Sequence, residues 1–161
     1  LHLSIRRQRQ MCIRDSYDTL YTLEKLSEHD YLIGVIANGR SKIKQFRLHS
    51  LGIMHVINYL TTSETVGYRK PHPKIFEDMI EQLGVKPEEV MYVGDDALND
   101  VAPARAMGMV SVWYKQEDAE LEPLEDEVDY TITTIEELLN ILPENFEPEG
   151  EERNGNGFIY E

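Results

Sequence analysis

The sequence is poor in the residues that cross-link a chain, anchor it in a membrane or bind nucleic acid. A single cysteine, Cys12, among 161 residues excludes a disulfide framework and a cysteine zinc cluster. No apolar run approaches about 18 residues, so we expect no membrane span. Positive charge is also scarce, because 16 Lys and Arg oppose 30 Asp and Glu for a net charge of −14. This acidity argues against nucleic-acid and anionic-membrane partners, and we expect a reducing, cytoplasmic setting.

The chain does contain enough apolar residues for one folded domain. Apolar residues make up 41% of the sequence and charged residues 29%, and this balance is too apolar for wholesale disorder. A length of 161 residues fits one domain with a core and leaves little room for a second.

The two ends differ from the middle in charge. Residues 1–16 carry four Arg and one acid, and this head resembles translated library-linker sequence at the ends of assembled metagenomic reads. We interpret it as non-native and expect the gene to begin upstream; a basic nucleic-acid arm is the alternative. Residues 143–161 carry six Glu and one Arg, which predicts a disordered acidic tail. The apolar residues 158–160 could instead form a docking patch.

Residues 17–142 are predicted to fold as an α/β domain. Short apolar runs that suit buried strands alternate with amphipathic segments of helical spacing. This alternation predicts a Rossmann-like parallel sheet with helices on both faces. We expect helices at 17–29, 41–51, 73–83, 98–107 and 134–142, and strands at 31–37, 55–60, 89–93, 109–114 and 129–134.

Acidic residues gather where the predicted strand at 89–93 ends. Gly94 allows a turn there, Asp95 and Asp96 follow it, and Asp100 begins the next helix. Carboxylates at one strand edge repel one another unless a cation lies among them, and hard oxygen ligands of this kind suit Mg²⁺. A helix N-terminus that is acidic for dipole reasons is the alternative.

Two further segments are expected at the same edge of the sheet, where such folds bind ligands. Lys70 precedes Pro71, which favours an extended backbone and a rigidly held lysine that can neutralise phosphate or carboxylate charge. Asn38 and Gly39 follow the first predicted strand, and their turn can offer backbone N–H groups to phosphate oxygens. A solvated lysine and an ordinary turn are the alternatives, and His72 is interpreted as a surface histidine.

The order of these segments resembles the haloacid dehalogenase-like (HAD) hydrolase superfamily. A strand ends in Asn-Gly, Lys-Pro follows, and a later strand leads into Gly-Asp with a further Asp. The resemblance covers residues 17–142 and is most specific over 63–96, which read SETVGYRKPHPKIFEDMIEQLGVKPEEVMYVGDD. It is closest to the phosphatase-type subfamily that carries a helical cap.

The resemblance implies hydrolysis of a small phosphorylated metabolite through an aspartyl-phosphate, with Mg²⁺ as cofactor. Lys70 matches the catalytic lysine that steadies the nucleophile and the phosphate. Asp95 matches the direct metal ligand. Carried over to this sequence, the implied metal residues are Asp95, Asp100 and Asp96, and the implied phosphate-binding residues are Asn38, Gly39 and Lys70.

Two departures from the family pattern concern the chemistry. Ala37 stands where the family usually has a Thr or Ser hydroxyl, and losing one such donor can lower the rate on the order of a hundredfold. The family nucleophile belongs to an Asp-x-Asp pair after the first strand, and no Asp-x-Asp follows an apolar strand here. The nearest pair, Asp15 and Asp18, is separated by two residues and is not preceded by a strand.

These departures predict the C-terminal part of a longer enzyme, without the first strand and most of the cap. In this fold the first strand lies between the strands predicted at 31–37 and 89–93. We expect the gap either to close or to be filled by residues 1–5, because buried strands would otherwise leave unpaired backbone. The chain is predicted to be inactive and marginally stable.

Three alternatives belong to other functional classes. A phosphoacceptor receiver domain would place its lysine after its acids, whereas Lys70 precedes Asp95. A dinucleotide-binding fold would need a G-x-G-x-x-G motif directly after a strand, and none of the predicted strands is followed by one. A degenerate, non-catalytic HAD-like binding module stays open, and Ala37 favours it. A dehalogenase is less favoured than a phosphatase, because the metal carboxylates suit phosphate better than halide.

Overall fold

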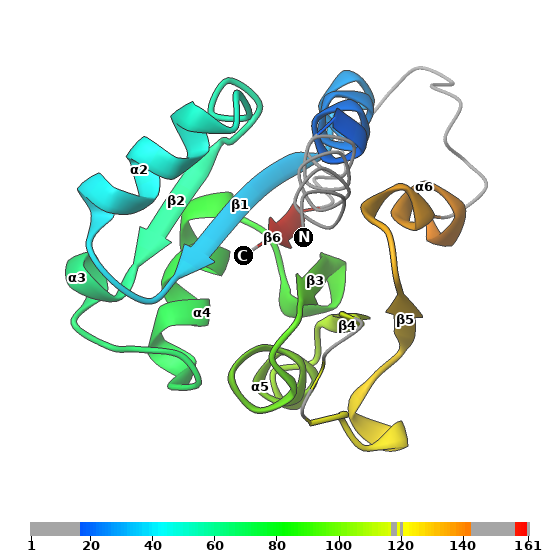
Figure 1. Ribbon diagram of the computed structural model, residues 1–161. Coiled ribbons are helices and arrows are strands. Elements are labelled where there is room, and N and C mark those ends of the chain that lie inside the picture. Colours follow the sequence, from blue (N-terminus) through cyan, green and yellow to red (C-terminus); the bar gives the residue numbers. More distant parts are fainter. Residues whose placement is uncertain (1–16, 117–118, 120, 143–156, 161) are drawn as a thin grey trace, which may run out of the picture.

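Strands and helices alternate along the chain, as the apolar runs predict. A computed structural model describes residues 17–116, 119, 121–142 and the backbone of 157–160 (Figure 1). The strands are β1 (Leu32–Ala37), β2 (Tyr59–Thr62), β3 (Val90–Gly94), β4 (Val110–Tyr114), β5 (Tyr130–Ile132) and β6 (Gly157–Tyr160). The helices are 17–28, α2 (Ser41–Ser50), α3 (Ser63–Val66), α4 (Pro73–Leu83), α5 (Ala102–Ala106) and α6 (Leu138–Ile141). Short turns of helix are η1 (Pro87–Glu89), η2 (Ala97–Val101), η3 (Glu125–Glu127) and η4 (Ile135–Glu137), of which η2 is π-helical.

The six strands form one parallel sheet in the order β2-β1-β6-β3-β4-β5. Helices lie on both of its faces (Figure 1). Along β1, Ile33 and Val35 join an apolar cluster with Leu26 of helix 17–28, whereas Ile36 joins a second cluster with Phe76 of α4. Alternate side chains of a strand point to opposite faces, so β1 is buried on both sides. The predicted α/β fold with a Rossmann-like parallel sheet is confirmed.

Helix α4 shows how the local sequence sets the boundaries of an element. Pro73 occupies its first turn, where a missing N–H costs nothing, and the ring of His72 accepts a hydrogen bond from the Lys74 N–H. The helix stops at Gly84, which has a φ of 69° that glycine adopts without strain. The predicted limits of this helix are confirmed.

The predicted second strand began too early. β2 starts at Tyr59, not at residue 55, because the backbone turns at 53–56 with a hydrogen bond from the Val56 N–H to the Ile53 carbonyl. The side chain of Asn58 then accepts a hydrogen bond from the Ile33 N–H at 2.7 Å. A side chain thus takes the place of a ladder bond, and regular pairing with β1 begins one residue later.

The central strand of the sheet comes from the segment that composition assigned to a disordered tail. β6 pairs with β1 and with β3, and Tyr160 is the register partner of both Val35 and Val93. The expectation for residues 157–160 was therefore wrong. These residues form a strand because the sequence predicts a gap between β1 and β3. The two strands do not pair with each other, so without β6 each would leave a row of backbone groups unpaired. Residues 1–16 and 143–156 lie outside the described residues.

None of the helices in residues 17–116 and 121–142 is long and apolar enough to cross a membrane.

Candidate active site

The candidate residues come from four places along the chain and meet at the carboxyl ends of the strands. Asn38 and Gly39 follow β1, and Asp95 follows β3. Lys70 lies in the loop between α3 and α4, and Asp100 lies in the π-helical turn η2. Carboxyl ends of parallel strands share one edge of a sheet, and open α/β sheets bind ligands there.

Lys70 and Asp100 form a buried ion pair at this edge. The Lys70 Nζ lies 2.7 Å from the Asp100 Oδ1, and the two side chains are 1% and 0% exposed. A charge buried this deeply is tolerated only when it is paired and hydrogen-bonded. The structure thus places in direct contact two residues that the sequence assigned to separate roles.

Tyr92, which sequence reasoning missed, completes this cluster. Its hydroxyl donates a hydrogen bond to the Asp100 Oδ1 at 2.7 Å and lies 3.5 Å from the Lys70 Nζ. The Tyr92 side chain is fully buried. A buried tyrosine hydroxyl needs a partner, so a lone tyrosine within the apolar run of β3 was the signal that could have revealed it.

The second oxygen of Asp100 is an exception among the described residues. Its Oδ2 is the only buried side-chain nitrogen or oxygen in that part of the chain for which no hydrogen-bond partner is present. Leaving a buried charged acceptor unpaired costs about 1–3 kcal/mol or more. An unpaired buried acceptor calls for a specific explanation, and here it belongs to a residue that the sequence assigned to metal binding.

The backbone of Gly94 makes room for Asp100. A Cβ built on Gly94 would lie 2.4 Å from the Asp100 Cβ and 2.8 Å from its Cγ. Any other residue would therefore push Asp100 away from the end of β3. Glycine is needed here for close approach and not for an unusual φ.

Asp96 caps the turn that carries Asp100. Its Oδ1 accepts hydrogen bonds from the Leu98 and Asn99 N–H groups at 3.0 Å, and its Oδ2 accepts one from the Asn99 side chain. Partial burial tends to raise the pKa of this carboxyl, but these hydrogen bonds outweigh that effect and hold its pKa below the ordinary value. The observed contacts make Asp96 a support for the Asp100 backbone.

Asp95 is exposed at the end of β3. Its Oδ2 accepts a hydrogen bond from the Gln116 side chain, and its carbonyl accepts one from the Trp113 indole N–H at 3.1 Å. Within the described residues, no three His, Cys, Asp or Glu side chains gather closely enough to hold a metal ion. The structure does not bring Asp95, Asp96 and Asp100 together as one carboxylate cluster.

Asn38 contacts the lysine loop. Its side-chain oxygen accepts a hydrogen bond from the Lys70 N–H at 2.8 Å, and its side-chain amide donates to the Lys70 carbonyl at 3.3 Å. This two-point contact holds the backbone of Lys70 against the end of β1. The Asn38 side chain is therefore engaged in positioning the lysine.

The turn after Asn38 is held by helix α3. The Gly39 N–H donates to the Ser63 Oγ at 2.9 Å, and the Ser41 N–H donates to the Glu64 carboxylate at 3.0 Å. Gly39 has a φ of 125°, which few other residues adopt. The Gly39 N–H thus points at an oxygen acceptor supplied by the first residue of α3, a contact that the sequence did not reveal.

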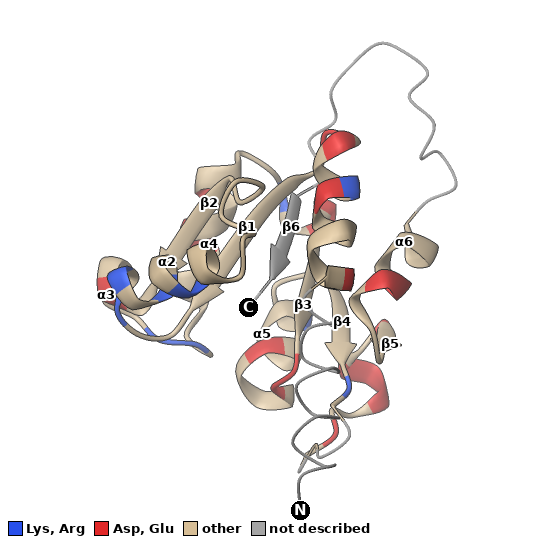
Figure 2. Cartoon of the chain, turned by 45° about the horizontal axis from the view of Figure 1, so that its top comes forward, with Lys and Arg blue, Asp and Glu red and all other residues tan. Residues whose placement is uncertain are grey.

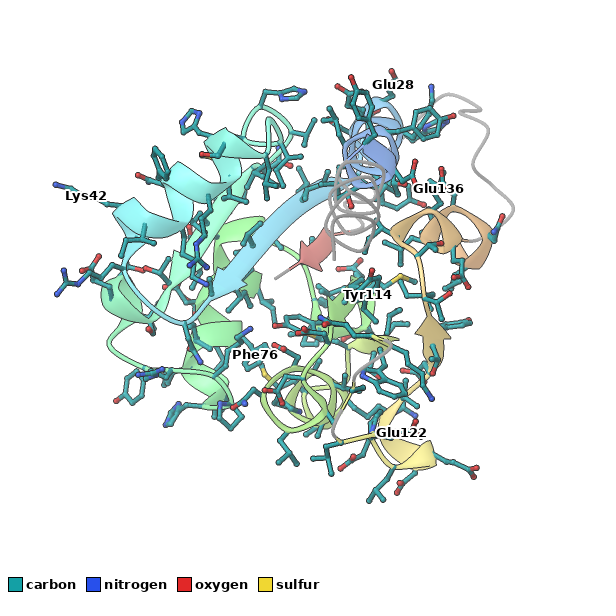
Figure 3. The ribbon with its side chains drawn as sticks, viewed as in Figure 1. Glu28, Lys42, Phe76, Tyr114, Glu122 and Glu136 are labelled. Carbon is teal, nitrogen blue, oxygen red and sulfur yellow. The ribbon has the colours of Figure 1, made fainter. Side chains whose placement is uncertain are left out.

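Charge is divided between the two sides of this edge. Residues 31–86 carry eight Lys and Arg and four acids, a net charge of +4, whereas residues 87–142 carry two and fifteen, a net charge of −13. Figure 2 shows the basic segments mostly around α2 and in the loop after α3, and many of the acidic ones beside β3, β4 and β5. Lys42 of α2 points away from the body of the protein in Figure 3. Lys70 and Asp100 meet where the two charge regions adjoin.

The chain is a Rossmann-like α/β domain with a buried Lys–Asp pair and an exposed aspartate at the carboxyl edge of its sheet, where such sheets bind ligands. The profile of the haloacid dehalogenase-like hydrolase family matches residues 7–114. The chain belongs to this family. The match begins within the head, residues 1–16.

The similar proteins include phosphatases and a dehalogenase. The chain is 37% identical over 130 residues to glyceraldehyde 3-phosphate phosphatase of Methanopyrus kandleri, covering 79% of this chain and 56% of that protein. The crystal structure of a HAD phosphatase from Thermococcus onnurineus superposes with a TM-score of 0.70 at 35% identity, covering 77% and 56%. A dehalogenase structure gives 0.73 at 25% identity, covering 80% and 56%. The chain spans about half the length of the curated relatives it matches.

Proposed function

We propose that the chain is the C-terminal part of a Mg²⁺-dependent HAD phosphatase that hydrolyses a small phosphomonoester in the cytoplasm through an aspartyl-phosphate. The buried Lys70–Asp100 pair at the carboxyl edge of the sheet carries this proposal. Several relatives in the same family are phosphatases of small phosphorylated metabolites. A lysine held beside the reaction site supplies fixed positive charge for phosphoryl oxygens.

The residues present suit a magnesium ion. Mg²⁺ usually takes one or two carboxylates and completes its shell with water and phosphate oxygens. The unpartnered Asp100 Oδ2 and the exposed Asp95 carboxylate are oxygen donors of that kind. We assign Asp95 and Asp100 as ligands, with Asp96 supporting Asp100 through its cap. Bound there, Mg²⁺ would neutralise charge on the phosphate.

Phosphate is proposed to bind between Lys70 and the turn at Asn38 and Gly39. The Gly39 N–H already points at an oxygen, that of Ser63, and a phosphate oxygen is a stronger acceptor than a hydroxyl. Ala37 supplies no hydroxyl at this turn, so backbone donors have to bind the phosphate. Asn38 keeps Lys70 beside them through its two-point contact.

We further propose that this chain does not turn over substrate. No Asp-x-Asp follows any of the strands, so the nucleophile would come from a segment that the sequence does not contain. Assay of the 161-residue chain with p-nitrophenyl phosphate and Mg²⁺ is expected to show no turnover above background. Turnover that Asp95→Asn abolishes would contradict this inactivity. Sequencing the source DNA upstream of Tyr17 tests the fragment: an apolar strand ending in Asp-x-Asp is expected there.

A non-catalytic binding module is the second candidate, favoured by Ala37 and by the engaged Gly39 N–H. Titration of the folded chain with Mg²⁺ separates the two candidates, because a module that only binds partners has no use for metal carboxylates. Saturable binding at millimolar Mg²⁺ that Asp100→Asn removes supports the phosphatase. Absence of such binding, with the fold intact by circular dichroism, supports the module.

A further inference from the structure

We propose that Tyr92 is a positioning residue of this site, which holds the Asp100 carboxylate so that its Oδ2 is the oxygen presented to a cation. That the cation is Mg²⁺ rests on the proposed function. The orientation itself follows from the contacts of Tyr92, Lys70 and Asp100.

Two donors converge on one oxygen of Asp100. The Lys70 Nζ and the Tyr92 hydroxyl each lie 2.7 Å from Oδ1, whereas Oδ2 is buried and has no partner among the described residues. A carboxylate oxygen has about two lone-pair sites. The two donors therefore fill Oδ1 and leave Oδ2 as the oxygen that can accept a further positive partner.

The hydroxyl of Tyr92 is not needed to fill the core. Its ring packs against Phe76 of α4, labelled in Figure 3, at a centroid distance of 5.3 Å and an interplanar angle of 56°. Both side chains are fully buried, and phenylalanine would fill the same space. A tyrosine here places a hydroxyl within an apolar cluster, and the hydrogen bond from this hydroxyl to Asp100 offsets the cost of removing it from water.

Without the hydroxyl, the Asp100 carboxylate would be held by Lys70 on one side only. It could then turn about its terminal torsion, which is broad and roughly two-fold, and exchange its two oxygens. Groups that orient a metal ligand typically change metal affinity ten- to a hundredfold when they are removed. Tyr92 would act in this way through Asp100, without touching the cation.

The test is Mg²⁺ binding by the full 161-residue chain, measured by titration calorimetry. Tyr92→Phe is expected to weaken the affinity about tenfold or more. Phe76→Leu is the matched control, because it disturbs packing against the same ring and removes no polar atom; its affinity should stay within about twofold. Equal affinities of wild type and a folded Tyr92→Phe would overturn the proposal, as would an equal loss in Phe76→Leu.

A metal-free measurement separates this proposal from the proposed function. Melting temperatures of Tyr92→Phe, Asp100→Asn and the double variant form a double-mutant cycle. Tyr92→Phe should lower the melting temperature clearly less in the Asp100→Asn background than in wild type. If the two substitutions are coupled in this way but the chain binds no Mg²⁺, the metal role is contradicted and the positioning role of Tyr92 is supported. Additive shifts would overturn the positioning role whatever the metal does.

Discussion

The sheet consists of two half-sheets of opposite charge. The first half contains β2 and β1 with α2, α3 and α4, in residues 31–86, which have a net charge of +4; helix 17–28, which also packs on β1, is not counted in it. The second half contains β3, β4 and β5, in residues 87–142, which have a net charge of −13. They are joined by the backbone of β6, by an apolar cluster in which Phe76 packs against Tyr92, and by the contact of Lys70 with Asp100 and Tyr92. In the function proposed above, the first half would supply the phosphate-binding residues and the second half the cation ligands, and Lys70 and Asp100 lie where the two halves meet.

The largest effect is expected from breaking the backbone connection between the halves. Ile159→Pro places a residue without an N–H inside a strand that is paired on both sides, where it removes a ladder hydrogen bond and where proline is not normally found. Thermal unfolding followed by circular dichroism should lose its cooperativity or shift strongly downward. Ile159→Val is the control and should unfold nearly as wild type does. An unchanged transition in the proline variant would show that β6 does not join the halves in solution.

The next effect concerns the side-chain connection. Lys70→Met leaves the buried Asp100 charge without its counter-ion, so we expect a loss of about 3–5 kcal/mol in the free energy of unfolding. Lys74 is the matched lysine: it pairs with Glu77 at 2.8 Å in solvent, and Lys74→Met should barely move the urea midpoint. Similar midpoints for both variants would contradict the stabilising role of the buried ion pair.

A smaller loss of stability is expected from alanine at two strand glycines, one in each half, and the two losses should differ. Gly94→Ala places a Cβ against the Cβ and Cγ of Asp100, and such overpacking costs about 1–3 kcal/mol. Gly34→Ala meets the Sδ of Met79 at 2.6 Å, where a flexible side chain can move aside. We expect the urea midpoint to fall further for Gly94→Ala. The reverse order would show that Asp100 moves more easily than Met79.

The smallest effect is a pH dependence in the acidic half. Hydrogen bonds hold the pKa of Asp96 below its ordinary value of 3.8, so the carboxylate stabilises the fold above that pH and loses this contribution as the pH falls through its lowered pKa. Asp96→Ala removes the cap and should cost about 1 kcal/mol at pH 7. Urea midpoints of wild type and variant should converge toward pH 2; a constant difference would argue against the carboxylate cap.

The sequence predicts the fold well wherever burial alone sets an element. The apolar runs that became β1, β3 and β4 are covered on both faces, so their limits were within two residues. The sequence predicts the fold poorly where an element forms only because other strands pair with it. β6 has four residues within a segment rich in Gly, Asn and Glu, and it forms because two strands flank it, a condition that local propensity does not contain.

The site divides in the same way. Residue types and their order indicate Lys70, Asp95 and Asp100 as chemical residues, because phosphate and cation chemistry require those groups at a strand edge. The partners inside the protein depend on geometry across the sheet. That the Asn38 side chain holds the Lys70 backbone, and that Tyr92 donates to Asp100, could not be deduced from spacing alone.

The position of β6 also has a consequence for how the protein is made. In the 161-residue chain, residues 31–142 are translated before 157–160, so β1 and β3 are made before the strand that pairs with both of them. The sheet can close only when the late strand arrives between them, which makes its closing contacts long-range and slow to form. Strand edges that lack a partner can pair with other chains, so in this chain the interval before β6 forms is the one in which aggregation or chaperone binding is expected.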